Sequence, residues 1–301
     1  MRIGVDLGGT KIEALAMDDA GLELQRIRVG TPKGDYQGTV DAIAGLVRQI
    51  EAAQGVQATV GVGIPGTVVR STGLVKNANS TWLIGKPLEK DLSEALGREV
   101  RCANDANCFA ISEATDGAAA GYDVVFGVII GTGCGGGVAI NGEIAAGPNG
   151  LRGEWGHAPL PWQTAEEFPG PDCYCGRKGC TEKWISGTGF EEDFKRVTGK
   201  DWRGSEIVTA AQAGDAESVA ALDRLEDRLA RSLAMLVNIL DPDAIVLGGG
   251  LSKLDFLYTG NLQQRVGEYT FGKGCEAPIL RNLHGDSSGV RGAAWLWPMV
   301  K

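Results

Sequence analysis

The chain of 301 residues lacks the features that would place it at a membrane or on nucleic acid. No apolar run approaches the roughly 18 to 20 residues that a membrane-spanning helix needs. No basic cluster occurs, and the net charge of −9 would repel the phosphodiesters of nucleic acid. The chain also opens directly into a strand-like segment, without the basic and apolar leader of a secreted protein. We expect a cytoplasmic protein with no membrane or nucleic-acid partner.

Histidine is scarce as well, since the chain has only two, whereas cysteine occurs seven times. One histidine and three cysteines fall in one stretch with the spacing His-x15-Cys-x-Cys-x4-Cys: His157, Cys173, Cys175 and Cys180. Three thiolates and a neutral imidazole fill the tetrahedral shell of Zn²⁺ and leave no place for water. We predict a structural zinc site that orders the loop of about residues 157–182. Free thiols beside a chance histidine are the alternative.

Glycine, by contrast, is abundant, and it first gathers in a turn between two strand-like segments. Residues 2–5 and 12–17 are apolar runs of strand type on either side of Asp6-Leu7-Gly8-Gly9-Thr10-Lys11. Glycine lacks the Cβ that would keep phosphate oxygens away from backbone N–H groups. Asp6 could hold a hydrated Mg²⁺, while Thr10 and Lys11 offer a hydroxyl and a cation. A plain hairpin is the alternative.

A second turn repeats this pattern in the middle of the chain. The strand-like residues 124–130 run into Gly131-Thr132-Gly133-Cys134-Gly135-Gly136-Gly137, and residues 138–140 resume a strand. Two such units predict two related α/β domains that face a shared central cleft, each supplying one phosphate-binding turn. This layout is typical of a nucleotide-dependent phosphotransferase.

Asp105, within Asn104-Asp105-Ala106-Asn107, is the candidate catalytic base. It follows the strand-like residues 99–103 and opens a predicted helix over 106–119, where side chains project from the ends of sheet strands. Phosphoryl transfer needs a carboxylate that accepts the proton of the attacking hydroxyl. Asp105 could instead be only a helix N-cap.

Two further glycine segments follow strand-like runs. Gly63-Ile64-Pro65-Gly66 comes after residues 58–62, and Gly66 could present its N–H to a hydroxyl. Gly248-Gly249-Gly250 comes after residues 243–247 and could let adenine lie flat on the backbone. Between them, residues 215–240 repeat apolar positions at helical spacing, which predicts a long core helix.

Taken together, these motifs resemble the ROK family (repressors, open reading frames and kinases), and the resemblance spans the whole chain. Two segments look most similar to bacterial fructokinases of the manno(fructo)kinase type, namely KNANSTWL over 76–83 and HGDSSGVRGAAWLWP over 284–298. The resemblance implies an actin-like, ribonuclease H-like fold, a homodimer and phosphorylation of fructose or mannose by ATP. It also implies that the last helix packs back on the N-terminal domain.

These inferences give a predicted site and predicted domains. The domains are residues 1–120 with 288–301, and residues 121–287 with the zinc loop. Carboxylates placed beside the zinc site suit the hydroxyls of a sugar, and the resemblance supports the contacts to the sugar. The expected sugar-binding residues are Gly66, Asn79, Asn104, Asp105, Glu154, His157 and Glu182. The expected nucleotide-binding residues are Gly4, Asp6, Leu7, Gly8, Gly9, Thr10, Lys11, Thr132, Gly133, Cys134, Gly135, Gly136, Gly137, Gly249 and Gly250.

Several alternatives stay open at this point. The motifs that handle phosphate and proton do not distinguish hexoses, so N-acetylglucosamine or glucose could be the substrate. The family also includes sugar-responsive regulators, but those carry an added N-terminal DNA-binding segment, whereas the first strand here begins at the start of the chain. A sugar-binding protein without catalysis would be expected to lack Asp105 or the turn residues, and both are present.

Overall fold

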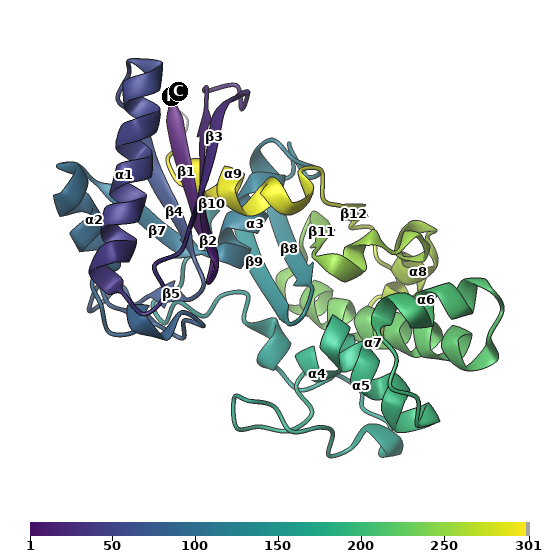
Figure 1. Ribbon diagram of the computed structural model, residues 1–301. Helices are drawn as coiled ribbons and strands as arrows, with labels where there is room; N and C mark the ends of the chain where they lie inside the picture. The colour runs from purple at the N-terminus through teal and green to yellow at the C-terminus, as the bar shows by residue number, and fades with distance from the viewer. Residues whose placement is uncertain (299–301) are drawn as a thin grey trace. The chain divides into compact units, whose positions relative to one another are not determined.

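A computed structural model describes residues 1–298 and divides the chain into two compact units (Figure 1). The first unit comprises residues 1–123, 137–152 and the segment from Leu283 onward. The second comprises residues 124–136 and 153–282. The predicted domains also had a discontinuous N-terminal part, but they assigned residues 137–152 to the C-terminal one. As a division into folding domains they stay a prediction.

The first unit is built on a five-stranded sheet of the order β3-β2-β1-β4-β7. The β1, β4 and β7 strands run parallel, whereas β2 and β3 extend the sheet antiparallel from β1. The predicted strands over 2–5 and 12–17 are confirmed as β1 and β2. The strands are β1 (Arg2–Leu7), β2 (Lys11–Met17), β3 (Glu23–Gly30), β4 (Thr59–Ile64) and β7 (Val100–Asn104), with a separate small pair β5 (Thr67–Val68) and β6 (Val75–Lys76).

Apolar residues alternate in β2 so that both faces of this sheet are covered. Ala14 and Ala16 belong to the core cluster that includes the buried residues of α1, whereas Leu15 and Met17 join a second cluster with α3 and α9. Successive side chains of a strand point to opposite faces, which accounts for the division. The helices of this unit are α1 (Tyr36–Gln54), α2 (Leu88–Leu96), α3 (Asp105–Thr115) and α9 (Ser288–Ala294), with 3-10 turns at Thr81–Leu83 and Gly285–Ser287.

Glycines allow α9 to approach the sheet closely. A Cβ on Gly4 of β1 would collide with the carbonyl oxygen of Val290, and one on Gly61 of β4 with that of Ala293. The predicted return of the last helix to the N-terminal sheet is therefore confirmed. Gly4, which we predicted to bind nucleotide, lies under this helix, so packing explains why the position is a glycine.

The second sheet has the order β10-β9-β8-β11-β12, which repeats the order of the first sheet. Its β8, β11 and β12 strands are parallel, and β9 pairs with β10 antiparallel. The predicted repeat of one α/β pattern is thereby confirmed. The strands are β8 (Val124–Ile130), β9 (Cys134–Ile140), β10 (Glu143–Ile144), β11 (Ala244–Gly248) and β12 (Ile279–Arg281).

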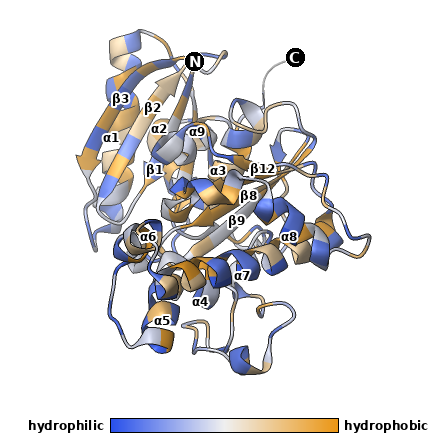
Figure 2. Ribbon diagram, turned by 90° about the vertical axis from the view of Figure 1, so that its right-hand side faces the viewer, coloured by the Kyte–Doolittle hydropathy of each residue, from blue (hydrophilic) through white to orange (hydrophobic). Residues whose placement is uncertain are grey.

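The longest helix, α7, begins and ends close to where the sequence predicts. Asp215 caps its first turn, and Asp241 ends it in a left-handed conformation just before Pro242. In Figure 2 hydrophobic and hydrophilic residues alternate along α7, whereas β8 is mainly hydrophobic. The helices of the second unit are α4 (Glu182–Ile185), α5 (Gly187–Thr198), α6 (Gly204–Gln212), α7 (Ala216–Leu240) and α8 (Asn261–Tyr269), and 3-10 turns lie at Trp155–His157, Ala165–Glu167, Gly250–Lys253 and Asp255–Tyr258.

Within residues 1–298, no helix is long and apolar enough to cross a membrane.

Candidate active site

The turn between β1 and β2 presents two free backbone amides. The N–H of Gly8 donates to the carbonyl of Lys11 at 3.0 Å, which closes the turn. Thr31, after β3, supports it from the side, because its hydroxyl donates to Gly8 O at 2.7 Å and its N–H to Thr10 O at 3.0 Å. The N–H groups of Gly9 and Thr10 have no hydrogen-bond partner among residues 1–298. They can therefore bind an anion such as a phosphate.

Two carboxylates lie beside this turn, at the ends of parallel strands. Asp6 is the penultimate residue of β1, and Asp105 follows β7, with β4 between the two strands. Loss of hydration, then the charges of Asp105 and Glu13, raise the pKa of Asp6 to about 6, while Lys11 acts to lower it. Because the carboxylates repel one another, a cation placed between them would be favoured.

Asn104, and not Asp105, caps helix α3. The Asn104 side chain accepts the N–H of Ala106 at 2.9 Å, and it has the extended backbone of an N-cap. Asp105 Oδ1 also accepts this N–H, at 2.8 Å. The Asp105 side chain is partly exposed to solvent, but the surrounding protein atoms remove much of its hydration, and this raises its pKa. The hydrogen bonds from Ala106 and Asn104 act in the opposite direction and are the weaker effect. The carboxylate is thus left available for chemistry, which the cap alternative did not allow.

The predicted sugar-side residues Gly66 and Asn79 lie near Asn104. The carbonyl of Gly66 accepts the Asn104 amide at 3.1 Å, while Asn79 N–H donates to Pro65 O at 3.2 Å. The N–H of Gly66 is already bonded to Ile64 O at 2.9 Å. The expectation that this N–H binds a hydroxyl is therefore not supported. Glycine is needed here because a Cβ would lie 2.8 Å from Lys76 O.

The second turn, between β8 and β9, also presents two free amides. Gly131 N–H donates to Gly133 O at 3.0 Å, and the N–H groups of Thr132 and Gly133 have no partner among the described residues. Its supports come from about 50 residues later. Glu182 Oε2 accepts the N–H of Cys134 at 2.9 Å, and Gly187 N–H donates to Gly131 O at 2.7 Å.

The second turn is shorter than predicted, because β9 already begins at Cys134. Gly135, Gly136 and Gly137 are strand residues. A Cβ on Gly136 would lie 2.7 Å from Trp155, and one on Gly137 would collide with the carbonyl of Ala106. Close packing, and not an open phosphate-binding loop, explains these two glycines.

The glycines after β11 divide in the same way. Gly249 has a φ of +84°, and a Cβ there would lie 2.6 Å from Ile130 O, so it packs against the end of β8. Gly250 has open space where a Cβ would stand. Only Gly250 therefore offers a bare surface on which a flat base could lie.

The four predicted zinc ligands come together in the second unit. Their ligand atoms all lie within 4.8 Å of one another, with Cys173 Sγ 3.6 Å from His157 Nδ1 and Cys175 Sγ 3.6 Å from Cys180 Sγ. A tetrahedral zinc shell places neighbouring ligand atoms about 3.5 to 3.8 Å apart, so the residues fit the ion. Nδ1 of His157 faces the thiols. Its Nε2 lies 2.9 Å from the hydroxyl of Tyr174, which is exposed.

Their surroundings shift the pKa values of two of these thiols in opposite directions. The backbone N–H of Arg177 is the main cause that lowers the pKa of Cys175 to about 7, whereas burial raises that of Cys180 to about 12. The contact of 3.6 Å between the two sulfurs adds to both shifts, because it lowers the pKa of Cys175 and raises that of Cys180. A bound Zn²⁺ would ionise the coordinating thiols outright.

The zinc loop has a second anchor on α7. Glu167 is buried, and its Oε1 accepts hydrogen bonds of 2.8 Å from both Arg228 and Arg231. Burial acts to raise the pKa of Glu167, but the bonds from Arg231 and Arg228 prevail and lower it to about 2. Arg231 also donates to the carbonyls of Pro161 and Trp162. The loop is thus tied to α7 independently of the four ligands.

Of the two predicted sugar-binding carboxylates of this unit, Glu182 has a further role. It begins α4, two residues after Cys180, and one of its oxygens holds the second turn. Glu154 is exposed and precedes the 3-10 turn that ends at His157. Thr31, Gly187 and Tyr174 contact the site but were missed, because neither their residue type nor their spacing marks them.

The family model described as the ROK family matches residues 2–300. The chain belongs to the ROK family. An N-acetyl-D-glucosamine kinase of Vibrio cholerae is 41% identical over 98% of this chain and 99% of its own length. Another, of Yersinia enterocolitica, is also 41% identical with the same coverage.

Solved structures of ROK proteins share this fold. A ROK hexokinase from Thermus thermophilus gives a TM-score of 0.86 at 31% identity, covering 98% of this chain and 97% of that one. A ROK glucokinase from Streptomyces griseus, in complex with glucose and AMPPNP, gives 0.74 at 30% identity, covering 97% of each chain. The predicted fold class, two actin-like, ribonuclease H-like α/β units with a Cys/His cluster able to hold zinc, is therefore confirmed.

Proposed function

We propose that this ROK protein is an ATP-dependent sugar kinase that phosphorylates a free hexose at its 6-hydroxyl. One observation carries the proposal: two turns in equivalent strand positions each present two unpaired amides, and Asp105 stands at the end of a parallel strand beside the first turn. Family membership and the names of its relatives support the same activity.

Each turn has a proposed partner on the nucleotide. The amides of Gly9 and Thr10, with Lys11, would bind phosphate oxygens, and Asp6 would hold the hydrated Mg²⁺ that accompanies ATP. The amides of Thr132 and Gly133 would bind phosphate oxygens in the same manner. Mg²⁺, when bound, neutralises charge on the phosphates. It would also lower the raised pKa of Asp6, since the ionised carboxylate is its ligand.

Asp105 is the proposed base. The sugar oxygen forms a bond to the γ-phosphorus while the bond to ADP breaks, and the hydroxyl proton passes to the Asp105 carboxylate. The raised pKa of Asp105 makes it a better acceptor than an ordinary carboxylate. It is still far too weak to deprotonate a free alcohol beforehand, so proton transfer comes late and orientation supplies most of the rate.

The side chains proposed to contact the sugar hydroxyls are those that the sequence predicted. Asn79, Asn104 and Asp105 belong to the first unit, and Glu154, His157 and Glu182 to the second. His157 would bind a sugar hydroxyl through Nε2, because Nδ1 faces the thiols. The exposed hydroxyl of Tyr174, which now contacts Nε2, would have to move away. Zinc would fix this imidazole and Glu182 and would take no part in the reaction.

Two sugars are supported by different observations. N-acetyl-D-glucosamine is favoured by the full-length relatives at 41% identity, which bear that name, and it is the alternative that the sequence analysis kept. Fructose or mannose is favoured by residues 76–83 and 284–298, which resemble manno(fructo)kinases. The first segment includes Asn79, so it belongs to the proposed sugar site itself.

The test is a coupled ADP-release assay with Mg-ATP on the zinc-loaded protein. The sugars are N-acetylglucosamine, fructose, mannose and glucose, and Asp105→Asn is the paired variant. We expect turnover on at least one sugar, and a loss of about a thousandfold or more in Asp105→Asn, which stays folded because Asn104 carries the cap. The ratio of kcat/KM values assigns the sugar. Absence of turnover on every hexose would overturn the proposal.

A further inference from the structure

A cavity of about 650 Å³ opens in the first unit, at the free edge of β7. Its walls come from β7, from the loop after β5, from residues 142–152 and from the chain after α9, all of which belong to this unit. The volume is in the range of about 300 to 1,000 Å³ that is usual for small-molecule sites. Of the residues predicted to bind substrate or nucleotide, only Asn104 lines it.

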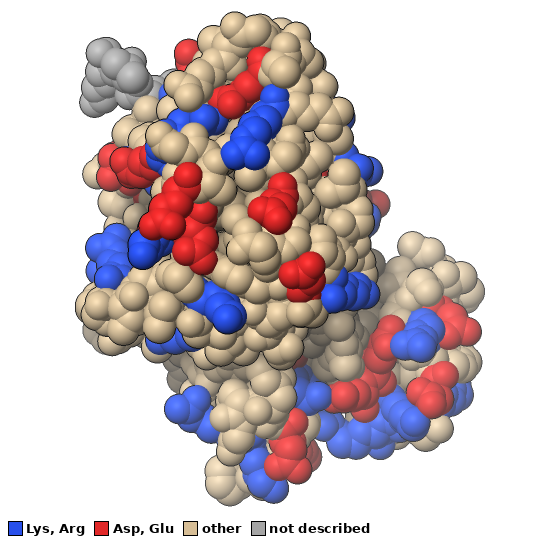
Figure 3. All heavy atoms as spheres, turned by 60° about the vertical axis from the view of Figure 1, so that its left-hand side comes forward, with Lys and Arg blue, Asp and Glu red and all other residues tan. Residues whose placement is uncertain are grey.

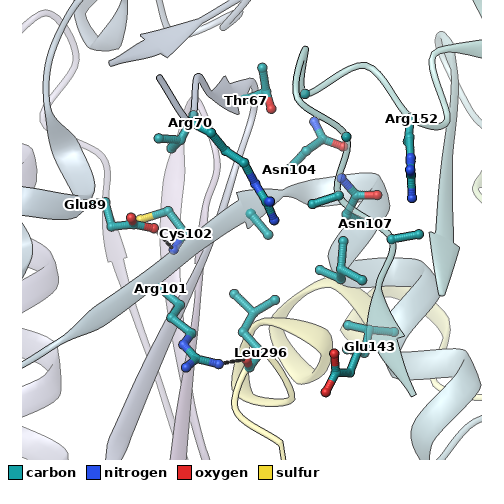
Figure 4. A pocket seen from close by; sticks show the side chains of 18 of the residues that line it. Thr67, Arg70, Glu89, Arg101, Cys102, Asn104, Asn107, Glu143, Arg152 and Leu296 are labelled. Carbon is teal, nitrogen blue, oxygen red and sulfur yellow. Dashed lines mark hydrogen bonds between the residues drawn. The ribbon is translucent and has the colours of Figure 1, made fainter. Parts of the chain in front are cut away.

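Two arginines in this cavity have no ion-pair partner among the described residues. Among the arginines of residues 1–298, only Arg70, Arg152 and Arg177 have a guanidinium without a hydrogen bond, ion pair or aromatic partner, and two of these three line the cavity. Figure 4 shows Arg70 and Arg152 on either side of Asn107, with their side chains extending into the cavity. Elsewhere, on the face seen in Figure 3, Lys and Arg are interspersed with Asp and Glu.

Most other charged side chains of the wall already have partners within the protein. Arg101 donates to Leu296 O at 3.0 Å and lies over the Trp297 ring at 4.0 Å. Glu89 accepts the N–H of Cys102 at 2.7 Å. Glu143 is the remaining carboxylate of the wall. Arginines therefore outnumber carboxylates, in a chain whose net charge is −9. A small anion suits this place.

The cavity also offers a polar group for a hydroxyl, and apolar surface. Asn107 Oδ1 is buried and has no hydrogen-bond partner among the described residues. A buried acceptor of this kind gains from a donor on a ligand. Ile111, Trp295 and Leu296 supply the apolar part of the wall. An inorganic anion would leave both the amide and this surface unused.

We propose that this cavity binds a small phosphorylated polyol of the class of a sugar monophosphate. Its phosphate would lie between Arg70 and Arg152, because guanidinium groups match phosphate oxygens in geometry and charge. A hydroxyl of the ligand would hydrogen-bond to the side-chain amide of Asn107. This class of ligand includes the product of the proposed reaction. Only the identification of the ligand with that product rests on the proposed function. Asn104 and Asn107 flank Asp105 on the β7–α3 segment, so occupancy of the cavity is expected to inhibit turnover.

The experiment is calorimetric titration of the full-length protein with the 6-phosphates of N-acetylglucosamine, fructose and glucose, and with inorganic phosphate. Saturating sugar and a non-hydrolysable ATP analogue fill the proposed active site beforehand. We expect one sugar phosphate per chain, bound more tightly than inorganic phosphate. Arg70→Gln and Arg152→Gln should each weaken it about tenfold. Arg48→Gln should not, because the Arg48 side chain lies on the surface of α1 and donates only to Ala95 O.

Initial rates without added sugar phosphate should be the same in Arg70→Gln and Arg152→Gln as in the parent chain. Absence of binding, or binding that both substitutions leave unchanged, would overturn the proposal even in an active kinase. Equal affinity for inorganic phosphate would overturn the assignment to a sugar phosphate. If no hexose is phosphorylated but sugar phosphates bind through the two arginines, the proposed function fails and the cavity site stands.

Discussion

The two glycine turns occupy equivalent positions in two sheets of the same strand order, but they are supported in different ways. The first turn is held by Thr31, which lies about 20 residues away along a continuous run of antiparallel strands. The second turn is held by Glu182 and Gly187, which follow a long loop that carries the Cys/His cluster. One turn therefore depends on its own sheet, and the other depends on a distant loop.

This difference has a consequence for how each turn responds to change. The hydroxyl of Thr31 is neutral, whereas Glu182 contributes a charge-assisted bond, which is roughly twice as strong. Glu182 also follows Cys180 by two residues, so a metal ion bound at Cys180 would act on the second turn through Glu182. We expect the second turn to be sensitive to zinc and the first turn to be independent of it.

Removal of zinc should have the largest effect and should separate the two turns. Chelation, or Cys180→Ser, would leave the thiols of a zinc-loaded cluster without their ion, and structural zinc contributes several kcal/mol to folding. We expect a lower melting temperature and faster hydrogen exchange over 131–135, with no change over 7–11. Calorimetry and exchange mass spectrometry measure these two quantities. Glu167 should keep residues 160–167 protected, because Arg228 and Arg231 still hold it.

Cys275→Ser is the matched control for that experiment, because Cys275 lies outside the cluster. It should leave exchange at both turns unchanged. Equal loss of protection at both turns on chelation would show that the contrast between them is wrong.

Glu182→Ala should come next in size. It removes the acceptor of the Cys134 N–H, a loss of about 1.5 to 3 kcal/mol for a charged partner. If the second turn binds nucleotide, Glu182→Ala raises KM for ATP as well as KM for the sugar. Glu182→Gln keeps an oxygen that can accept the Cys134 N–H, so it should restore the affinity for ATP more than the affinity for the sugar. Steady-state kinetics with each substrate varied gives this split.

Glu192→Ala serves as the control, because Glu192 lies close by and pairs with Lys183 away from the turn. An unchanged KM for ATP in Glu182→Ala would show that the support of the second turn by Glu182 does not contribute to nucleotide binding.

Asp6→Asn should have a smaller effect, confined to the first unit and dependent on pH. The pKa of Asp6 is about 6 in the folded chain against an ordinary value of 3.8, so folding opposes its ionisation. The stability that this group contributes is complete below about pH 4 and is lost as the pH rises through 6. Asp6→Asn should therefore raise stability at pH 8 by about 1 to 2 kcal/mol and leave it unchanged at pH 4.

Calorimetry measures the melting temperature of the parent chain and of Asp6→Asn at the two pH values, in the absence of Mg²⁺ and nucleotide. Asp41→Asn, on the exposed side of α1, is the control. A gain that is equal at pH 4 and pH 8 would contradict the proposed cause.

Thr31→Val should have the smallest effect. It keeps the shape of the side chain but removes the hydroxyl bond to Gly8 O, which is worth about 1 kcal/mol. We expect a modest rise in KM for ATP, smaller than in Glu182→Ala, and no dependence on zinc. Thr31→Ser should restore the parent value. A larger effect than that of Glu182→Ala would reverse the ranking of the two supports.

Local pattern was enough to predict much of this molecule. The strands around both turns, the long helix predicted over 215–240 and the cluster of His157 with three cysteines follow from periodicity, capping residues and spacing. These are properties of short segments, in which each residue constrains its near neighbours. The repeated pattern of strand, glycine turn and strand predicted two related α/β units, and the two sheets share one strand order.

Contacts between distant segments decided the rest. Periodicity does not show that Gly4 lies beneath α9, that Gly136 packs against Trp155 or that the N–H of Gly66 is already bonded, because each depends on which backbone comes near. For the same reason the sequence could not show that Asn104, and not Asp105, is the N-cap of α3, or that Arg70 and Arg152 line one cavity. The sequence by itself determined the strands around the two glycine turns, the long helix and the Cys/His cluster. Tertiary structure decided which glycines serve packing and which polar groups remain free to bind, because hydrogen bonds and close contacts are settled only when remote chain segments meet.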